Sequence, residues 1–273
     1  MMSANFRGRG DRRPQNAVIG SGLQPNWNLR TSSFDDLHLK PDLAHGIFSC
    51  DYKIPSEIQQ LAIQPIIERK NVIAQAQSGT GKKSAFSIGI LQRIDTSKKE
   101  TQTLVLSPTR ELADQIYDAL VQIGSKMRGL SIELFTCRSN IKEQEKASIK
   151  PHIVISTPNI SQALFNDGFL KYENLSIVCL AEADKLLQND FIVQTQNIFH
   201  FLNPNVQILL FSATIPYIVF QFMEQFMHNP IKILVKAEQL KLEGIPQYFI
   251  DVGQPDFKWN TLIDFYGSIN QYL

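Results

Sequence analysis

Short apolar runs alternate with amphipathic stretches along the chain from residue 34 onward. Seven runs are rich in β-branched residues or leucine and are bounded by turn or cap residues, which predicts strands. They cover residues 72–74, 104–106, 132–135, 153–155, 177–180, 206–211 and 231–235. Residues 111–127 repeat apolar side chains every three to four positions and predict a helix. Apolar strands that alternate with helices predict an α/β fold, in which helices cover both faces of a mostly parallel sheet.

The two ends of the chain differ from this central block. Residues 1–33 have few apolar side chains and carry five arginines against one aspartate. This composition predicts a disordered basic arm, which either touches RNA phosphates weakly or is a solvated tail with no specific role. Residues 237–246 are charged and turn-forming and predict a linker, followed by a strand at 247–252 and a helix at 258–269. Residues 247–273 are too few to bury a core by themselves.

Composition narrows the class of protein. The chain has 27 basic and 26 acidic side chains, which argues against a polycation that coats nucleic acid. Its three cysteines, Cys50, Cys137 and Cys179, form no Cys-x-x-Cys pair, which excludes a disulfide framework and fits a reducing compartment. No apolar run resembles a secretory signal or approaches the ~20 residues of a membrane span. We therefore expect no membrane association and an intracellular location, cytoplasmic or nuclear.

A glycine-rich turn separates the strand at 72–75 from a helical stretch at 84–93. Its residues are Ala76, Gln77, Ser78, Gly79, Thr80, Gly81, Lys82 and Lys83. Such a turn, followed by lysine and a helix, is typical of a P-loop, whose backbone N–H groups cradle phosphates while Lys82 reaches the terminal ones. The last position usually carries a hydroxyl that binds Mg²⁺, and the ammonium group of Lys83 cannot ligate a cation. A chance Gly-x-Gly-Lys turn is the alternative.

Further motifs follow in a consistent order. They are Phe34 with residues 52–59, residues 107–113 (Ser-Pro-Thr-Arg-Glu-Leu-Ala), residues 181–184 (Ala-Glu-Ala-Asp) and residues 212–214 (Ser-Ala-Thr). Together with the glycine-rich turn, they resemble those of the DEAD-box ATP-dependent RNA helicases, in the eukaryotic initiation factor four-A group. The resemblance runs from about Phe34 to the end of the chain. It implies an N-terminal RecA-like, ATP-binding domain over residues 34–236 and the start of a second RecA-like domain at 247–273.

The resemblance also implies a role for each matching residue. Gln59 would read the adenine edge, and an aromatic side chain near Tyr52 would stack on the base; a helix-start turn is the alternative for Pro-Ser-x-x-Gln, and the motif taken alone favours it. Glu182 would activate water and act with Lys82 in catalysis. The remaining implied residues are Pro108, Thr109, Arg110 and Thr157 for RNA binding, and Asp184, Ser212 and Thr214 for coupling the nucleotide to RNA. An ordinary strand-to-helix cap is the alternative for Thr109 and Arg110.

Four departures from the family pattern concern ligands. Ala181 stands where the family has the carboxylate that holds Mg²⁺, and Lys83 replaces the hydroxyl ligand, so we predict no metal site. Losing one preorganised charge stabiliser typically costs ~10²–10³ in rate. Two glycine-containing motifs are also altered, to Cys137-Arg138 and to Asn159-Ile160, which weakens the expected RNA contact. We therefore expect a chain that binds ATP, with Lys83 neutralising part of its charge, but hydrolyses it poorly.

The family binds ATP and RNA between two RecA-like domains, and the second supplies arginine fingers. Residues 247–273 could form only the opening strand and helix of that domain, so we expect no unwinding unless a partner acts in trans. Three functions stay open. The first is a hydrolysis-deficient protein that binds ATP and, weakly, RNA, and that sequesters a helicase partner through its surface. The second is an active ATP-dependent RNA helicase, in translation initiation or RNA processing, with unusual metal ligation. The third is a decaying duplicate without function.

Overall fold

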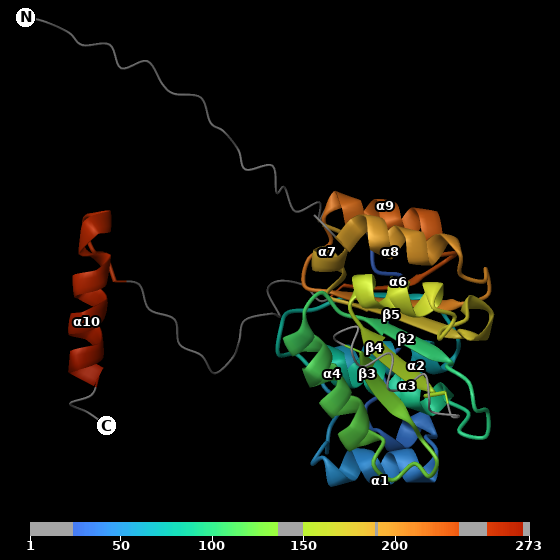
Figure 1. Ribbon diagram of the computed structural model, residues 1–273. Helices are drawn as coiled ribbons and strands as arrows, with labels where there is room; N and C mark the ends of the chain where they lie inside the picture. The colour runs from blue at the N-terminus through green and yellow to red at the C-terminus, as the bar shows by residue number, and fades with distance from the viewer. Residues whose placement is uncertain (1–23, 136–149, 189–190, 235–249, 270–273) are drawn as a thin grey trace, which may run out of the picture. The chain divides into compact units, whose positions relative to one another are not determined.

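The computed structural model describes residues 24–135, 150–188, 191–234 and 250–269 (Figure 1). The chain divides into two units, Met1–Lys236 and Ala237–Leu273. The first unit contains the sheet and its covering helices. The described part of the second contains the 3₁₀ turn η4 (Pro255–Phe257) and the helix α10 (Lys258–Ile269).

A seven-stranded sheet forms the centre of the first unit. Its order is β3-β4-β2-β5-β6-β1-β7, and every pairing is parallel. The strands are β1 (Val72–Gln75), β2 (Thr103–Leu106), β3 (Ile132–Phe135), β4 (Ile153–Ser156), β5 (Ile177–Ala181), β6 (Gln207–Ser212) and β7 (Ile231–Leu234). All seven lie where the apolar runs predict them. The strands β2, β4, β5 and β6 are buried throughout, as expected for a sheet covered on both faces.

Helices cover the sheet on both sides, which confirms the predicted fold class (Figure 1). One face carries α1 (Pro41–Ser49), α2 (Glu57–Ile67), α3 (Lys82–Arg93) and α4 (Arg110–Ile123). The other carries α6 (Pro158–Asn166), α7 (Ala183–Leu186), α8 (Phe191–His200) and α9 (Tyr217–Phe226). Short 3₁₀ turns, η1 (Asp35–Leu37) and η2 (Tyr172–Asn174), complete the unit.

The helix expected at 111–127 ends earlier, at Ile123, with Gly124 as its C-cap. Met127 follows the helix in a turn, where its backbone N–H bonds to the Gly124 carbonyl. Its side chain is nevertheless buried. A buried methionine in the turn therefore continues the apolar spacing beyond the true end of the helix, which explains the error.

Residues 24–33 make defined contacts within the first unit, so the disordered arm expected over 1–33 is wrong for this part; residues 1–23 lie outside the described residues. Asn26 bonds to the edge strand β7, where the Lys232 N–H donates to Asn26 Oδ1 at 2.7 Å. The Arg30 guanidinium forms an ion pair with the Glu57 carboxylate on α2, and Arg30 Nη2 lies 2.8 Å from Glu57 Oε1. The Asn26 contacts also cover part of an edge that parallel strands leave open.

The second unit confirms one prediction and corrects another. The helix predicted at 258–269 is present as α10. Residues 250–252 form no strand, although 247–252 predicts one; a strand needs a hydrogen-bonded neighbour, and the described residues of this unit provide none. The expected linker at 237–246 lies outside the described residues. Among the described residues, no helix is both long and apolar enough to cross a membrane.

Candidate nucleotide-binding site

Three adjacent strands bring the predicted nucleotide motifs to one edge of the sheet. β5, β6 and β1 lie side by side and parallel, so their carboxyl ends meet. The segments that follow them are residues 181–184, 212–214 and 76–83. The Ala76 N–H donates to the Ser212 carbonyl at 3.1 Å, which joins two of these segments directly. In open α/β sheets, ligands bind in the crevice beyond the carboxyl ends of the strands.

The glycine-rich turn has a backbone that only glycine adopts easily. Gly79 and Gly81 have φ angles of 83° and 98°. A Cβ at Gly81 would lie 2.7 Å from Ser56 Oγ and 2.8 Å from Gln59 Nε2, so the turn packs tightly on the start of α2. Within the described residues, the backbone N–H groups of Gly79, Gly81 and Lys82 donate to no protein acceptor. Unpaired N–H groups at the start of a helix suit an anion.

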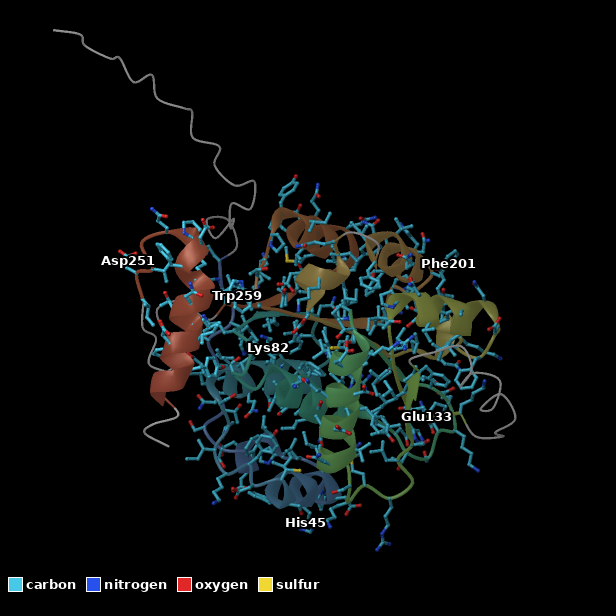
Figure 2. All side chains as sticks on the ribbon, turned by 60° about the vertical axis from the view of Figure 1, so that its left-hand side comes forward. His45, Lys82, Glu133, Phe201, Asp251 and Trp259 are labelled. Atoms are coloured by element: carbon cyan, nitrogen blue, oxygen red, sulfur yellow. The ribbon has the colours of Figure 1, made fainter. Side chains whose placement is uncertain are left out.

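Lys82 is the first residue of α3 and is labelled in Figure 2. Its ammonium group donates to the carbonyls of Ala76 and, at 2.7 Å, Gln77, so it lies against the turn. Partial burial lowers the pKa of Lys82, while the nearby carboxylates of Glu182 and Asp184 act in the opposite direction. The lysine is thus held beside the turn and within electrostatic reach of both carboxylates.

A cavity of about 500 Å³ opens between the glycine-rich turn, α4 and the end of β5. Its walls include Tyr52, Lys82, Lys83, Gln115 and Glu182. The volume lies within the range of ~300–1,000 Å³ that is usual for small-molecule sites. The cavity is therefore large enough for a nucleotide and is lined at one end by two lysines.

The two expected metal-ligating positions present no metal ligand. Lys83 extends to α4, where its Nζ donates to Gln115 Oε1 at 2.6 Å. Ala181 ends β5 with only 3% of its surface exposed, and its methyl group lines the cavity. A cation and a methyl group thus occupy the positions where the family has a hydroxyl and a carboxylate.

Glu182 has a constrained position and a cationic partner. Its φ of 57° places this non-glycine residue in the left-handed region, between β5 and α7. Such strain persists only where the surroundings hold it, and it is common at functional sites. Glu182 Oε2 lies 2.6 Å from Lys185 Nζ, and this hydrogen bond raises the pKa of Lys185. The carboxylate therefore already balances one positive charge.

Asp184 connects the ends of β5 and β6. Its backbone N–H donates to Ser212 Oγ at 3.1 Å, and its Oδ2 accepts from Thr214 Oγ1 at 2.7 Å and from the Thr214 N–H at 3.2 Å. The structure thus brings together the three residues that the sequence assigns to coupling. Their role in coupling stays a prediction.

The residues present do not fit a magnesium ion bound directly by the protein. Hard cations prefer oxygen ligands, and Mg²⁺ demands near-octahedral geometry. Of the two carboxylates in the crevice, Glu182 pairs with Lys185 and Asp184 with Thr214. Among the described residues, no three His, Cys, Asp or Glu side chains gather as a metal site.

The residues predicted to read the base lie beside the cavity. Gln59 is 3% exposed, and its Oε1 accepts from the Ser56 N–H at 2.9 Å. The helix-start turn that was the alternative for this motif is therefore present, and it uses the amide oxygen of Gln59. Tyr52 lines the cavity; its hydroxyl lies 2.6 Å from Ser84 Oγ and its ring meets Phe34 edge-on.

The predicted RNA-binding residues follow β2 and β4, which are neighbours in the sheet. Thr109 Oγ1 accepts from the Leu112 N–H at 3.2 Å, so this hydroxyl caps α4, as the alternative for this motif proposes. Arg110 is exposed, Pro108 is buried, and Thr157 precedes α6. Ile160 packs against the apolar core beneath α6, where the family has an arginine. Cys137 and Arg138 lie outside the described residues.

Two residues of this site were not predicted from the sequence. Lys185 is three positions after Glu182, a spacing at which side chains on a helix meet, so the pattern contained a usable signal. Gln115 is 32 positions from its partner Lys83, and nothing in the local pattern indicates this contact. The contact between Lys83 and Gln115 exists only because α3 packs against α4.

A parallel sheet with a glycine-rich phosphate turn at its carboxyl edge defines a P-loop nucleotide-binding protein of RecA-like fold. The family model for DEAD/DEAH box helicases matches residues 56–222. The chain therefore belongs to the DEAD/DEAH box helicase family. This agrees with the resemblance seen in the motifs.

Known proteins of similar sequence and structure agree with this assignment. The chain is 42% identical to the ATP-dependent RNA helicase eIF4A of Debaryomyces hansenii over 92% of its length and 43% identical to that of Lodderomyces elongisporus over 92%. It spans 64% of the length of each of these relatives. Among solved structures, S. cerevisiae Dbp5 bound to RNA and ADP BeF3 gives a TM-score of 0.71 at 29% identity, covering 80% of this chain and 55% of that one. A DEAD box protein from Methanococcus jannaschii gives 0.73 at 27% identity, covering 86% and 63%.

Proposed function

We propose that this chain binds ATP at the glycine-rich turn without requiring magnesium, and that it hydrolyses ATP poorly. One observation carries the proposal: the two positions that hold Mg²⁺ in the family present the ammonium of Lys83 and the methyl of Ala181. Phosphoryl transfer in this class depends on positioning and on neutralisation of charge at the phosphates. A chain that has exchanged a metal-binding pair for a fixed cation keeps attraction for the phosphates and loses the ion.

Binding is supported by the chain's own groups. Within the described residues the N–H groups of Gly79, Gly81 and Lys82 have no acceptor and can donate to an anion, and the ammonium group of Lys82 lies against the same turn. Lys83 lines the same cavity on the side of α4. Each ammonium group contributes attraction that needs no metal, because charge-assisted hydrogen bonds to phosphate oxygens form directly.

Weak hydrolysis is supported by the pairing of Glu182. A carboxylate that activates water must be within hydrogen-bond reach of that water. In this chain Glu182 Oε2 is 2.6 Å from Lys185 Nζ, so one oxygen of the carboxylate is already engaged by an ammonium group. The pairing thus acts in the same direction as the loss of the metal ligands.

We further propose that RNA contact at the ends of β2 and β4 is weaker than in the relatives. Arg110 is exposed and available for a phosphate, and Thr109 sits at the start of α4. Ile160, in contrast, packs on the core and offers no charge. Backbone contacts by cationic side chains supply most of the non-specific affinity for nucleic acid, so each lost cation reduces it.

The hydrolysis proposal is tested by phosphate release from the 273-residue chain with and without single-stranded RNA. The Lys82→Ala variant serves as the control for background turnover. We expect both proteins to release phosphate at the same rate, whether or not RNA is present. RNA-stimulated release above that of the Lys82→Ala control would contradict the proposal.

An active ATP-dependent RNA helicase is the second candidate. The intact contact of Asp184 with Ser212 and Thr214 favours it, since the family uses these residues to couple nucleotide and RNA. The relatives named as helicases are longer than this chain, so the same release assay is repeated with a complete second RecA-like domain of a relative added in trans. RNA-stimulated turnover only in the mixture would support the second candidate and limit the first to the isolated chain.

A further inference from the structure

A second cavity, of about 670 Å³, lies at the other end of α3 from the nucleotide site. Its lining comes from the segments that follow α2, α3 and α4 and from the start of α1. Helix α3 has 12 residues, which corresponds to about 18 Å at 1.5 Å per residue. Lys82 begins this helix and Arg93 ends it, so the two cavities lie at opposite edges of the sheet.

The second cavity is rich in positive charge. It is lined by four cations, Lys40, Arg69, Arg93 and Arg128, and by two carboxylates, Asp42 and Asp95. The ion pairs formed among the described residues all involve other side chains. The Asp95 carboxylate instead accepts from the N–H and hydroxyl of Ser97. None of the four cations therefore forms an ion pair in the described part of the chain, although Asp95 acts electrostatically on Lys40.

Arg93 is held firmly in this cavity. Its Nη1 donates to Gln207 Oε1 at 2.7 Å, and Gln207 Nε2 in turn donates to the carbonyls of Ile66, at 3.0 Å, and Lys70, at 2.7 Å. Gln207 is 4% exposed, so its amide is fully engaged and fixes the guanidinium. Burial lowers the pKa of Arg93 to about 10, and the positive charge of Arg69 contributes to this. Arg69 and Arg93 thus act electrostatically on each other, and among the described residues neither forms an ion pair with a carboxylate.

Stabilisation of helix ends does not account for this arrangement. Cations near the C-terminus of a helix interact favourably with its last carbonyls. Lys40 does so, since its Nζ donates to the Ile94 carbonyl at 2.5 Å, just beyond α3. Within the described residues, the guanidinium groups of Arg69 and Arg93 donate to no helix-end carbonyl, and Arg93 bonds to a side chain instead.

We propose that this cavity binds a small molecule that carries phosphate groups, held between Arg69 and Arg93. The planar guanidinium presents paired donors that match phosphate oxygens, and Arg93, which Gln207 already holds, loses little freedom on binding. Arg128 and Lys40 add positive charge to the lining of the same cavity. This site is separate from the glycine-rich turn and does not depend on the function proposed for it.

The test measures binding of inorganic pyrophosphate by calorimetry. The full chain carries Lys82→Ala throughout, so that the glycine-rich turn contributes as little as the protein allows. Arg69→Gln is added to remove one member of the pair, because Arg69 is exposed and its replacement leaves the core intact. Lys126→Gln is the matched control, since Lys126 is an exposed cation in the segment after α4 and does not line the cavity.

We expect Arg69→Gln to weaken pyrophosphate binding by at least about tenfold, the equivalent of one lost charge-assisted hydrogen bond, and Lys126→Gln to change it less than about twofold. Equal effects of the two substitutions would show a general charge effect and overturn the proposal. Absence of binding in the Lys82→Ala chain would also overturn it. Binding of an RNA oligonucleotide, but not of pyrophosphate, that depends on Arg69 would assign the cavity to nucleic acid and reject a small-molecule ligand.

A second measurement covers the case in which Arg69→Gln alters the fold. The Nε–H resonance of Arg93 is assigned by its loss in Arg93→Lys and is then followed during the pyrophosphate titration. We expect a saturable shift of this resonance with the affinity measured by calorimetry. A resonance that does not move, while pyrophosphate binds elsewhere, would contradict the proposal.

Discussion

At the scale of single residues, the site differs from that of its family through two side chains. Lys83 reaches Gln115 on α4, and Ala181 presents a methyl group to the cavity. An ammonium group has donors only and cannot ligate a metal ion. The change in chemistry is therefore larger than the change in shape, because the turn, the lysine at position 82 and the strands that position them are all present.

The partial burial of Lys82 predicts a dependence of ATP binding on pH. Burial lowers the pKa of Lys82, so this lysine loses its proton at a lower pH than an exposed lysine. The neutral amine no longer attracts phosphate, and ATP affinity should fall as the pH rises toward that lowered pKa. Titration with a fluorescent ATP analogue across the alkaline range measures this fall.

Lys82→Arg is the matched control for the pH dependence. Arginine stays charged throughout the alkaline range, so the fall in affinity should be smaller in this variant at every pH. If the chain and the Lys82→Arg variant lose affinity in parallel, another group is responsible and the assignment to Lys82 is wrong.

At the scale of elements, the glycine-rich turn is joined to the start of α2. The contact passes through Gly81, whose position leaves no room for a side chain beside Ser56 and Gln59. Residues predicted to bind phosphate and residues predicted to read the base are thus packed against each other. A substitution in the glycine-rich turn should therefore alter the position of the residues at the start of α2.

Gly81→Ala tests this contact, and Gly79→Ala is its matched control. Both glycines have positive φ, so each substitution should cost ~1–2 kcal/mol in backbone strain. A Cβ at Gly79 meets nothing within 4 Å, whereas at Gly81 it would lie 2.7 Å from Ser56 Oγ. Overpacking should add ~1–3 kcal/mol at Gly81 alone. Urea denaturation measures both costs, and equal destabilisation of the two variants would show that the close approach to α2 carries no energy.

The sequence located the strands of the sheet correctly, but it did not locate every end of a helix or every strand. The seven strands are short and mostly apolar, and their pattern alone located them. The end of α4 was missed because Met127 is buried outside the helix. The strand predicted at 247–252 was wrong over its described residues 250–252, because a strand needs a hydrogen-bonded neighbour and a segment's own sequence does not indicate one. The docking of Asn26 on β7 was missed because polar side chains give no period.

At the scale of the whole molecule, the order of strands in the sheet creates the site. Motifs that are distant in the sequence follow β1, β5 and β6, which are neighbours, so their predicted roles could be placed at one edge once the sheet was known. Individual motifs indicated the residues Lys82, Glu182, Asp184, Ser212 and Thr214. The contacts of Lys83 with Gln115 and of Arg93 with Gln207 depend on packing between distant segments and could not be read from the chain.

The second cavity was not predicted because its lining residues come from segments that are distant in the sequence. Arg69, Arg93 and Arg128 belong to three separate segments, each of which resembles an ordinary helix end. Only the packing of α2, α3 and α4 on one face of the sheet gathers these arginines. Charge counted along the sequence is close to balanced and conceals this local excess.

The proposed function depends on ATP binding that does not require magnesium. The most direct test compares the affinity of the chain for ATP in saturating Mg²⁺ with its affinity in excess chelator. The Lys83→Thr, Ala181→Asp double variant, which restores both family ligands, is the matched comparison. We expect the two affinities of the unaltered chain to agree within about threefold, or ~0.7 kcal/mol, and those of the double variant to separate by more than about tenfold. Loss of ATP binding by the unaltered chain on chelation would contradict the account.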